Sequence, residues 1–358
     1  MDASREVLRL PAPARVSDVE ALSAITGPVR TLERSRLTTV GYSAASHERL
    51  ELTLQTGEHR RLVVKRTRLS ADWTARRTSD RQGREATMLA EPALGAIWEA
   101  FACPYLAFAA DGDEIALVME DLSPYLFPDV REPLQEEQEE QVLRALATLH
   151  AHFWSSPLSP SPSLDLPWLA RPEHYAVLLD ARSAADPEAC AMLPDALRES
   201  VTRGWAAALE RLPPAATKVL TTPAAELAWL WEGLPRTLLH GDAKVANFAL
   251  LPDQRVAAFD WAFLGAGPAT IEVGWYLAVN ATRLSRSKEE LLARYRTLLA
   301  TELAAPMPDA LWTSLVRAGI VLGARMMLWS KALAVETDRP GARAEWTWWA
   351  EHLDAACT

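Results

Sequence analysis

Several features are scarce in this chain, and each scarcity excludes a class of protein. The 358 residues include only three cysteines, Cys103, Cys190 and Cys357. They are far apart and odd in number, so they suit neither a disulfide framework nor a CxxC metal site. The N-terminus lacks the apolar core of a signal peptide, and we find no apolar run of membrane-spanning length. We therefore expect a cytoplasmic protein without a membrane anchor.

Positive charge is also in short supply. Lysine and arginine total 37 residues against 47 acidic ones, which gives a formal net charge of −10 at pH 7. This balance disfavours nonspecific binding to nucleic acid or to an anionic membrane, and it leaves room for a cationic substrate. Apolar residues make up 49% and charged residues 23%, which is ordinary for a soluble globular protein long enough for two packed lobes.

Lysine itself is rare. Only five of the 37 basic residues are lysines, so arginine supplies generic charge nearly everywhere. Two of the five, Lys65 and Lys244, stand beside the motifs described below. A compact ammonium suits a point contact to phosphate where a guanidinium fork is too large. We therefore interpret these two lysines as candidate phosphate ligands, although an exposed lysine at a strand end is normally only solvated.

The most informative stretch runs from residue 236 to residue 261. Its polar residues are His240, Gly241, Asp242, Lys244, Asn247 and Asp260, set between short apolar runs. These runs predict a strand, a loop and a second strand that bring the polar side chains to one edge. The alternative is a hairpin in which the same side chains only cap turns.

The spacing of these residues matches the catalytic loop of kinases. Asn247 follows Asp242 by five residues, and Asp260 lies thirteen residues further on. Phosphoryl transfer needs a carboxylate that accepts the hydroxyl proton, and hard oxygen ligands that hold magnesium on a triphosphate. Asp242 suits the first role, and Asn247 and Asp260 suit the second.

With His-Gly-Asp at residues 240–242, the stretch resembles the aminoglycoside phosphotransferase superfamily, which includes choline kinase and ecdysteroid kinase relatives. The resemblance spans about residues 36–355, although only the central motif is specific. It implies an α+β, bilobal protein-kinase-like fold, with an antiparallel N-lobe sheet plus helix and a mainly helical C-lobe. It also implies ATP and Mg²⁺ as cofactors, with Asn247 and Asp260 as metal ligands. Lys65 and Lys244 would neutralise phosphate charge, and His240 would brace the loop.

The segment before residue 102 resembles the nucleotide-binding part of a kinase. Strands are predicted at 36–40, 50–54 and 61–64, and Lys65 ends the third strand like the kinase lysine that contacts the α and β phosphates. A helix over residues 80–101 carries Glu85, the candidate partner that orients Lys65. Glu91 is an alternative partner for Lys65, although the following Pro92 weakens this assignment. A further alternative is that the glutamate is exposed and only pairs with a nearby arginine. The loop at 41–47 has a single glycine, Gly41, and matches a phosphate-covering glycine loop poorly.

Residues 119–124 form a candidate hinge after two strands predicted at 106–109 and 115–119. An apolar strand ends there abruptly in polar residues and Pro124. By resemblance, the Glu120 carbonyl and the Leu122 N–H would bind adenine. We therefore predict an N-terminal nucleotide-binding lobe over residues 1–121 and a C-terminal catalytic and substrate-binding lobe over residues 122–358.

The predicted C-terminal lobe is mostly helical. A strong helix at 133–154 looks like the family helix that supports the catalytic loop, and further helices are expected at 187–211, at 222–232 and from residue 284 onward. The segment 265–267 is expected to turn into a helix starting near Pro268. Glu272 stands where relatives often have an aspartate, so its role in bracing the catalytic loop is doubtful.

These observations predict an ATP- and magnesium-dependent kinase that phosphorylates a hydroxyl of a small molecule. Aminoglycoside, sugar, choline-like and steroid acceptors all remain open, and a monomer or homodimer is expected. Two other hypotheses stay open. One is a nucleotide-binding pseudokinase with a regulatory role, favoured by the poor glycine loop, and the other is a helical scaffold protein that binds no nucleotide.

Overall fold

The computed structural model describes residues 6–38, 42–128, 131–156 and 159–357. The chain forms two compact units, one comprising Met1–Pro128 and Phe248–Ala262 and the other comprising Asp129–Asn247 and Phe263–Thr358. The hairpin that leads to Asp260 therefore packs with the N-terminal part of the chain. The lobe division predicted after residue 121 separates a nucleotide-binding part from a catalytic part, whereas the two units are defined by packing. The division by role stays a prediction.

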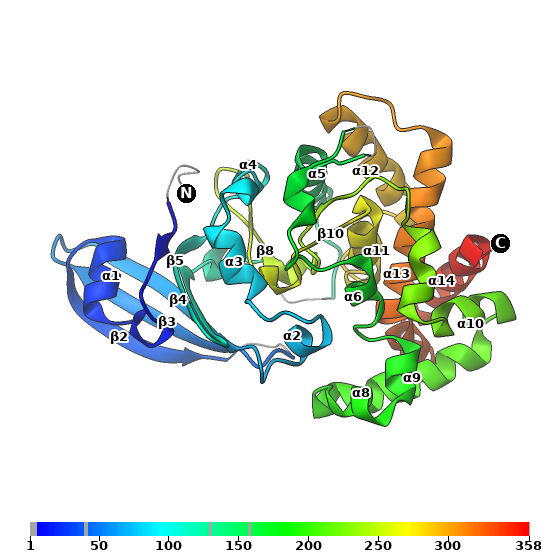
Figure 1. Cartoon of the computed structure of the whole chain (residues 1–358), viewed down its shortest axis with the longest axis horizontal. Helices are drawn as coiled ribbons and strands as arrows, with labels where there is room; N and C mark the ends of the chain where they lie inside the picture. Colours follow the sequence, from blue (N-terminus) through cyan, green and yellow to red (C-terminus); the bar gives the residue numbers. More distant parts are fainter. Residues whose placement is uncertain (1–5, 39–41, 129–130, 157–158, 358) are drawn as a thin grey trace. The chain divides into compact units, whose positions relative to one another are not determined.

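The first unit is built on a six-stranded sheet in the order β1-β5-β6-β4-β3-β2 (Figure 1). Its strands are β1 (Leu8–Arg9), β2 (Val29–Leu37), β3 (Ser46–Leu54), β4 (His59–Arg68), β5 (Tyr105–Asp111) and β6 (Glu114–Glu120). All neighbouring strands are antiparallel except β1, which pairs in parallel with β5. The predicted antiparallel sheet is confirmed, with this short parallel strand as an addition. Gly41 and the end of the strand predicted at 36–40 lie outside the described residues.

The two faces of this sheet differ because successive residues of a strand point to opposite sides. On one face, buried side chains such as Leu62 and Val64 form a core with Leu22 and Ile25 of helix α1 (Val19–Thr26). The neighbouring Lys65 belongs to the opposite face, where helix α3 (Arg84–Ala90) contacts β5 and β6. The strand alternation therefore puts the Lys65 side chain next to a helix and keeps Leu62 and Val64 in the core.

The single helix predicted over residues 80–101 is wrong. The segment contains α3, the 3-10 turn η2 (Pro92–Leu94) and the short helix α4 (Ile97–Ala100). Pro92 lacks a backbone N–H and disfavours helical backbone at the residue before it, so α3 ends at Ala90. Its N-cap residue is Gly83, and the carboxylate of the preceding Asp80 accepts from the backbone N–H groups of Gly83 and Arg84. Apolar periodicity alone missed these breaks.

A hairpin of β8 (Phe248–Leu250) and β9 (Val256–Ala258) completes the first unit. Ala257 forms a parallel bridge with Ala102, and Ala249 forms an antiparallel bridge with Leu126. A small apolar cluster that includes Leu122 packs on the same hairpin. These contacts fix the backbone that leads into Asp260.

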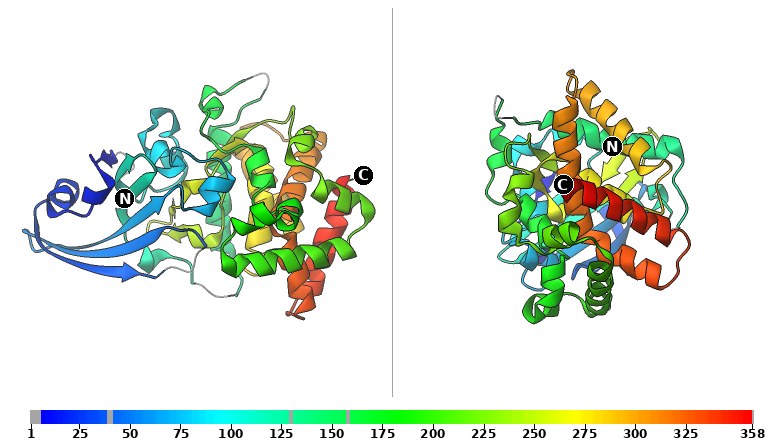
Figure 2. Two further views of the ribbon diagram at one scale, coloured as in Figure 1. Left: turned by 60° about the horizontal axis from the view of Figure 1, so that its bottom comes forward. Right: turned by 90° about the vertical axis from the view of Figure 1, so that its right-hand side faces the viewer.

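The second unit is mainly helical, as predicted. Its helices are α5 (Glu136–His152), α6 (Pro172–Ala176), α7 (Ala181–Ala185), α8 (Pro187–Ala191), α9 (Asp195–Arg211), α10 (Pro214–Thr221), α11 (Ala269–Val279), α12 (Lys288–Glu302), α13 (Asp309–Glu336) and α14 (Ala342–Cys357). Helix α13 contacts α9, α11 and α14, and α12 packs on α5 (Figure 2). The segment Gly265–Gly267, expected to be a turn, is instead strand β10, which pairs with β7 (Thr237–Leu239). The catalytic-loop stretch begins directly after β7.

Helix α13 is long and apolar enough to cross a membrane by length and composition. The relevant window has a mean hydropathy of 1.4, so the sequence-based statement that no run reaches that length was too strong. However, 72% of the window is buried inside the protein. A helix buried to this extent on three neighbouring helices is typical of the core of a soluble protein.

Candidate active site

A cluster of one buried lysine and two carboxylates forms on the α3 side of the first-unit sheet. Lys65 Nζ lies 2.6 Å from Glu85 Oε2 and 2.6 Å from Asp260 Oδ1. The structure thus brings together three of the predicted residues, whereas Glu91 caps the η2 turn through the N–H of Ala93. Burial alone lowers the pKa of Lys65, but the carboxylates of Asp260 and Glu85 outweigh that effect and raise the pKa above its usual value. The ammonium is therefore charged at neutral pH.

Tyr105 at the start of β5 completes this cluster, and the sequence analysis did not identify it. Its hydroxyl donates to Glu85 Oε1 at 2.6 Å and accepts from the Asp260 N–H at 3.2 Å. Burial, followed by the charge of Glu85, raises the pKa of Tyr105 well above its usual value, so the hydroxyl keeps its proton. Glu85 Oε1 accepts the Asp260 N–H as well, at 3.1 Å. Tyr105 and Glu85 together hold the backbone at Asp260.

Asp260 adopts an unusual backbone conformation. Its φ of 64° lies in the left-handed region, which aspartate tolerates better than most residues with a side chain. The side chain is 34% exposed although one oxygen contacts Lys65. A partly exposed carboxylate beside a fixed lysine suits a group that meets both a metal ion and phosphate.

The second cluster lies in the loop after β7 and begins with a glycine that the backbone requires. Gly241 has a φ of 83°, and a Cβ there would lie 2.2 Å from the carbonyl oxygen of Phe263. Any larger residue would meet both backbone strain and a steric clash. This explains locally why glycine stands between His240 and Asp242.

Three donors hold the carboxylate of Asp242, whose side chain is only 8% exposed. Oδ2 accepts from Lys244 Nζ at 2.8 Å and from Asn247 Nδ2 at 3.0 Å. Oδ1 accepts from the indole Nε1 of Trp275 at 3.0 Å. Asn247 Nδ2 also donates to the Asp242 carbonyl, so its amide oxygen is oriented away as an acceptor. The structure therefore brings the predicted Asp242, Lys244 and Asn247 together and adds Trp275.

Glu272 braces this loop, contrary to the doubt raised from the sequence. Its Oε1 accepts from the Gly241 N–H at 2.7 Å, and its Oε2 accepts from the His240 N–H at 3.1 Å. Oε2 also lies 2.8 Å from His150 Nε2, and His150 Nδ1 lies 2.5 Å from the Tyr295 hydroxyl. All these groups are buried, so a fully paired carboxylate fixes the start of the loop.

His240 and Asn280 hold the rest of the loop. His240 Nδ1 accepts from the Asp242 N–H at 3.3 Å, in keeping with its predicted bracing role. Asn280 Oδ1 accepts from the Val245 N–H at 2.9 Å, while its Nδ2 donates to the Ala243 carbonyl at 3.1 Å. Asn280 was missed because it lies at the C-terminal cap of α11, 35 or more residues after the groups that it holds, and only the fold brings them together.

The predicted hinge residues lie at the end of β6. The Glu120 carboxylate lies 2.5 Å from Arg60 Nη2. The backbone N–H of Glu120 donates to the Pro104 carbonyl. Leu122 is buried against the β8–β9 hairpin, and its carbonyl accepts from the Tyr125 N–H. The side chains of both residues are thus occupied with packing or an ion pair, and any adenine contact would involve the backbone.

Residues 44–309 match the family model described as the phosphotransferase enzyme family. The chain belongs to this family. Structural similarity is found to a choline kinase from Streptococcus pneumoniae (14% identity over 94% of this chain and 97% of that one, TM-score 0.48). It is also found to an aminoglycoside phosphotransferase from Alicyclobacillus acidocaldarius (14%, 92% and 90%, TM-score 0.43) and to a macrolide 2'-phosphotransferase from Brachybacterium faecium (17%, 94% and 98%, TM-score 0.38). No curated protein matches the sequence significantly.

Membership of the phosphotransferase family makes the chain a kinase-type enzyme that acts on small molecules. The matched segment contains both clusters, from Lys65 to Glu272. The protein-kinase-like α+β fold predicted from the sequence is confirmed.

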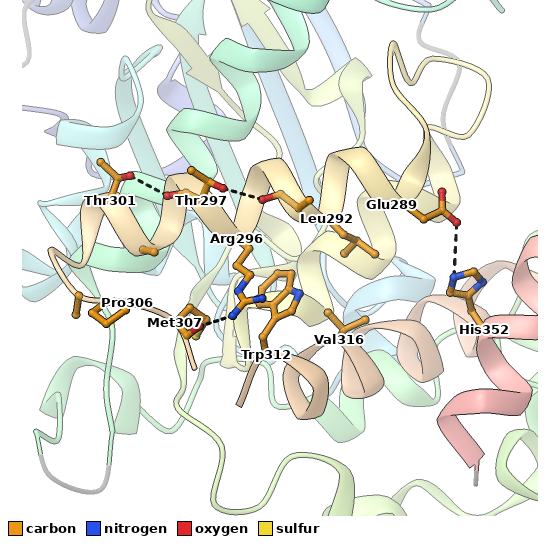
Figure 3. Close-up of a pocket in the computed structure, with 13 residues that line it drawn as sticks. Glu289, Leu292, Arg296, Thr297, Thr301, Pro306, Met307, Trp312, Val316 and His352 are labelled. Atoms are coloured by element: carbon orange, nitrogen blue, oxygen red, sulfur yellow. Dashed lines mark hydrogen bonds and ion pairs between the residues drawn. The ribbon is translucent and has the colours of Figure 1, made fainter. Parts of the chain in front are cut away.

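A groove of about 810 Å³ in the second unit is separate from these clusters. It is lined by α12, the start of α13, the connection between them and His352 of α14 (Figure 3). Arg296 lies over the Trp312 ring, and its Nη2 already donates to the Met307 carbonyl and to Asp309. None of the predicted site residues lines this groove. The groove is therefore built from other residues than those that carry the family's chemistry.

The donor chemistry fits a magnesium ion held largely by substrate. In the part of the chain that the structure describes, no three His, Cys, Asp or Glu side chains converge as a metal site. Magnesium is usually held by one or two protein oxygens together with substrate phosphates and water. The Asp260 carboxylate and the Asn247 amide oxygen are hard ligands of that kind.

Proposed function

We propose that this phosphotransferase uses ATP and Mg²⁺ to phosphorylate a hydroxyl group of a small organic molecule. The observation that carries the proposal is the set of three donors on the buried Asp242 carboxylate. Such a carboxylate is fixed in orientation and suits a group that accepts one proton from a positioned hydroxyl. Proton acceptance by Asp242 would increase the nucleophilicity of the acceptor oxygen as it attacks the γ-phosphorus.

Lys65 is the proposed ligand of the nucleotide phosphates. An ammonium has three N–H donors, and the contacts to Glu85 and Asp260 use two of them. The third can bond a phosphate oxygen without loss of the ion pairs that hold the side chain. Lys244 would neutralise charge on the transferring group, and its contact to Asp242 keeps it near the acceptor.

Asn247 and Asp260 are the proposed magnesium ligands, and the ion would supply charge neutralisation on the triphosphate when bound. Glu120 and Leu122 would bind the adenine through backbone groups at the end of β6. His240 and Glu272 support the loop without touching substrate. We assign the cytoplasm as the location, no nucleic-acid or membrane partner, and a monomer or homodimer as the working state.

The acceptor class stays broad, and aminoglycoside-, choline- and ecdysteroid-like hydroxyl compounds are the candidates. The net charge of −10 favours acceptors that carry an amine, through long-range attraction. A pseudokinase role is not favoured, because the chain belongs to a family of phosphotransferases and keeps Lys65, Asp242, Asn247 and Asp260.

ADP release from Mg-ATP tests the proposal across a panel of aminoglycosides, amino alcohols, sugars, nucleosides and sterols. We expect release that depends on one acceptor class, on magnesium and on Asp260, so Asp260→Asn serves as the blank. Asp253→Asn, on the exposed turn of the β8–β9 hairpin, is the matched control and should behave as wild type. A wild-type protein that binds no Mg-ATP would contradict the proposal outright.

A further inference from the structure

The three donors on the Asp242 carboxylate differ in whether they have a second role in the proposed reaction. Lys244 and Asn247 bond Oδ2, and under the proposed function they also serve phosphate and magnesium. Trp275 bonds Oδ1, and an indole N–H is a donor with no acceptor or charge to offer elsewhere. Substrate binding therefore gives no reason to exchange the hydrogen bond from Trp275.

We propose that Trp275 is a positioning residue for phosphoryl transfer, because its indole N–H fixes the Asp242 carboxylate with one lone pair of Oδ1 directed to the acceptor hydroxyl. The inference rests on the proposed function. A carboxylate offers about four lone-pair sites. Lys244 and Asn247 occupy the two on Oδ2, and Trp275 occupies one on Oδ1. The remaining site on Oδ1 accepts the proton.

The balance of the step is simple. The acceptor oxygen forms a bond to the γ-phosphorus, and its proton goes to Asp242 Oδ1. The bond from the γ-phosphorus to the bridging oxygen breaks, and its electron pair leaves with ADP. The indole keeps its own proton throughout, so Trp275 changes the orientation of the base and takes no part in proton transfer.

Helix α11 gives Trp275 a rigid base. Its neighbour Gly274 packs directly on α13, since a Cβ on Gly274 would lie 2.0 Å from the Gly319 carbonyl oxygen. Gly323 makes a similar approach, with its Cβ position 2.6 Å from the Gly274 carbonyl oxygen. Backbones in such contact leave α11 little freedom to slide or turn. The same helix holds the loop through Glu272, so the indole and the loop are fixed by one element.

Trp275→Phe tests the inference because it keeps a buried aromatic ring and removes the N–H donor together with part of the ring volume. With an acceptor found in the panel, we expect kcat to fall by about 100-fold, the effect of a misplaced reacting group. KM for Mg-ATP should stay at its wild-type value, which a general loss of structure would not allow. Trp229→Phe, at an exposed indole, is the matched control and should leave kcat unchanged. Wild-type kcat in Trp275→Phe would overturn the inference.

A second measurement covers the case in which Trp275→Phe does not fold. In the ¹H–¹⁵N spectrum, the Trp275 indole signal is assigned through contacts to its neighbours in α11, among the 14 tryptophans of the chain. Asp242→Asn replaces a charged acceptor by a neutral one, so this indole proton should move upfield more than any other. A Trp275 signal that does not move would overturn the inference. This arm needs no acceptor, so a failure of the proposed function would be seen separately in the turnover assay.

Discussion

Replacing Glu272 should expose how much the catalytic loop depends on one buried carboxylate. Glu272→Ala leaves three donors without an acceptor, namely the N–H groups of His240 and Gly241 and the Nε2–H of His150. A buried donor that loses its acceptor costs about 1–3 kcal/mol, and Glu272→Ala leaves three of them, so we expect a loss of about 3 kcal/mol or more. The relief of desolvation on removing the carboxylate is already included in such measured values.

Glu272→Gln should cost less, for a reason that the geometry makes definite. If the amide oxygen takes the Oε2 position, it still accepts from the His240 N–H and from His150. The amide nitrogen then faces the Gly241 N–H, and two donors cannot bond each other. In the opposite orientation, the other tautomer of His150 accepts from the amide, and the His240 N–H is unpaired. Either way one buried backbone N–H loses its acceptor, at about 1–3 kcal/mol.

Urea unfolding of wild type, Glu272→Gln and Glu272→Ala measures these differences, with the exposed Glu302→Ala as control. We expect the order wild type, Gln, Ala in decreasing unfolding free energy, and no change in the control. A Glu272→Ala protein within about 1 kcal/mol of wild type would refute the reasoning, since that is the size of a single ordinary hydrogen bond.

Three further outcomes follow from the same geometry. Gly241→Ala should lower the unfolding free energy more than Gly57→Ala in urea titrations. Both glycines have positive φ, but only at Gly241 would a Cβ lie 2.2 Å from a backbone oxygen. Equal losses in the two variants would contradict this reasoning. Tyr105→Phe should cost about 1–3 kcal/mol in the same titrations and weaken Mg-ATP binding in calorimetry, since a buried carboxylate loses a donor; wild-type values for both would count against it. Burial, followed by the charge of Lys65, lowers the pKa of His47 below its usual value of 6.5. The stability that the neutral His47 contributes to the folded protein is therefore present above pH 6.5 and is lost as the pH falls through the folded-state pKa. His47→Gln should therefore lose less unfolding free energy than wild type between pH 7 and pH 5, while the exposed His59→Gln should follow wild type.

The sequence was most informative where chemistry depends on residues close together in the chain. The fixed spacing of Asp242, Lys244 and Asn247 predicted a loop, and the structure places the three within hydrogen-bonding distance. Lys65 and Glu85 lie twenty residues apart, and they were matched through the family resemblance rather than through periodicity. Short strands were predicted from apolar runs and the turn residues between them, and the antiparallel sheet that they form was implied by the family resemblance.

The rest depended on contacts that no local pattern carries. Trp275 and Asn280 reach back about 35 residues to the loop, and nothing in an apolar helix marks one tryptophan as a donor. Glu272 was doubted because relatives often have aspartate there, yet the position of α11 lets the longer side chain reach three donors. Tyr105 is one of three aromatic residues in the described strands, with Phe108 and Phe248, and nothing in the local sequence distinguishes it from a core residue. Its role follows only from where α3 and Asp260 place their polar groups.

The most direct test of the account is the rate of γ-phosphate transfer from Mg-ATP to the identified acceptor by wild type and Asp242→Asn. General-base catalysis contributes about 100- to 10,000-fold, so we expect a fall of that size in kcat with an unchanged dissociation constant for Mg-ATP. Transfer by Asp242→Asn at the wild-type rate would contradict the account, because it would remove Asp242 as the group that accepts the acceptor proton.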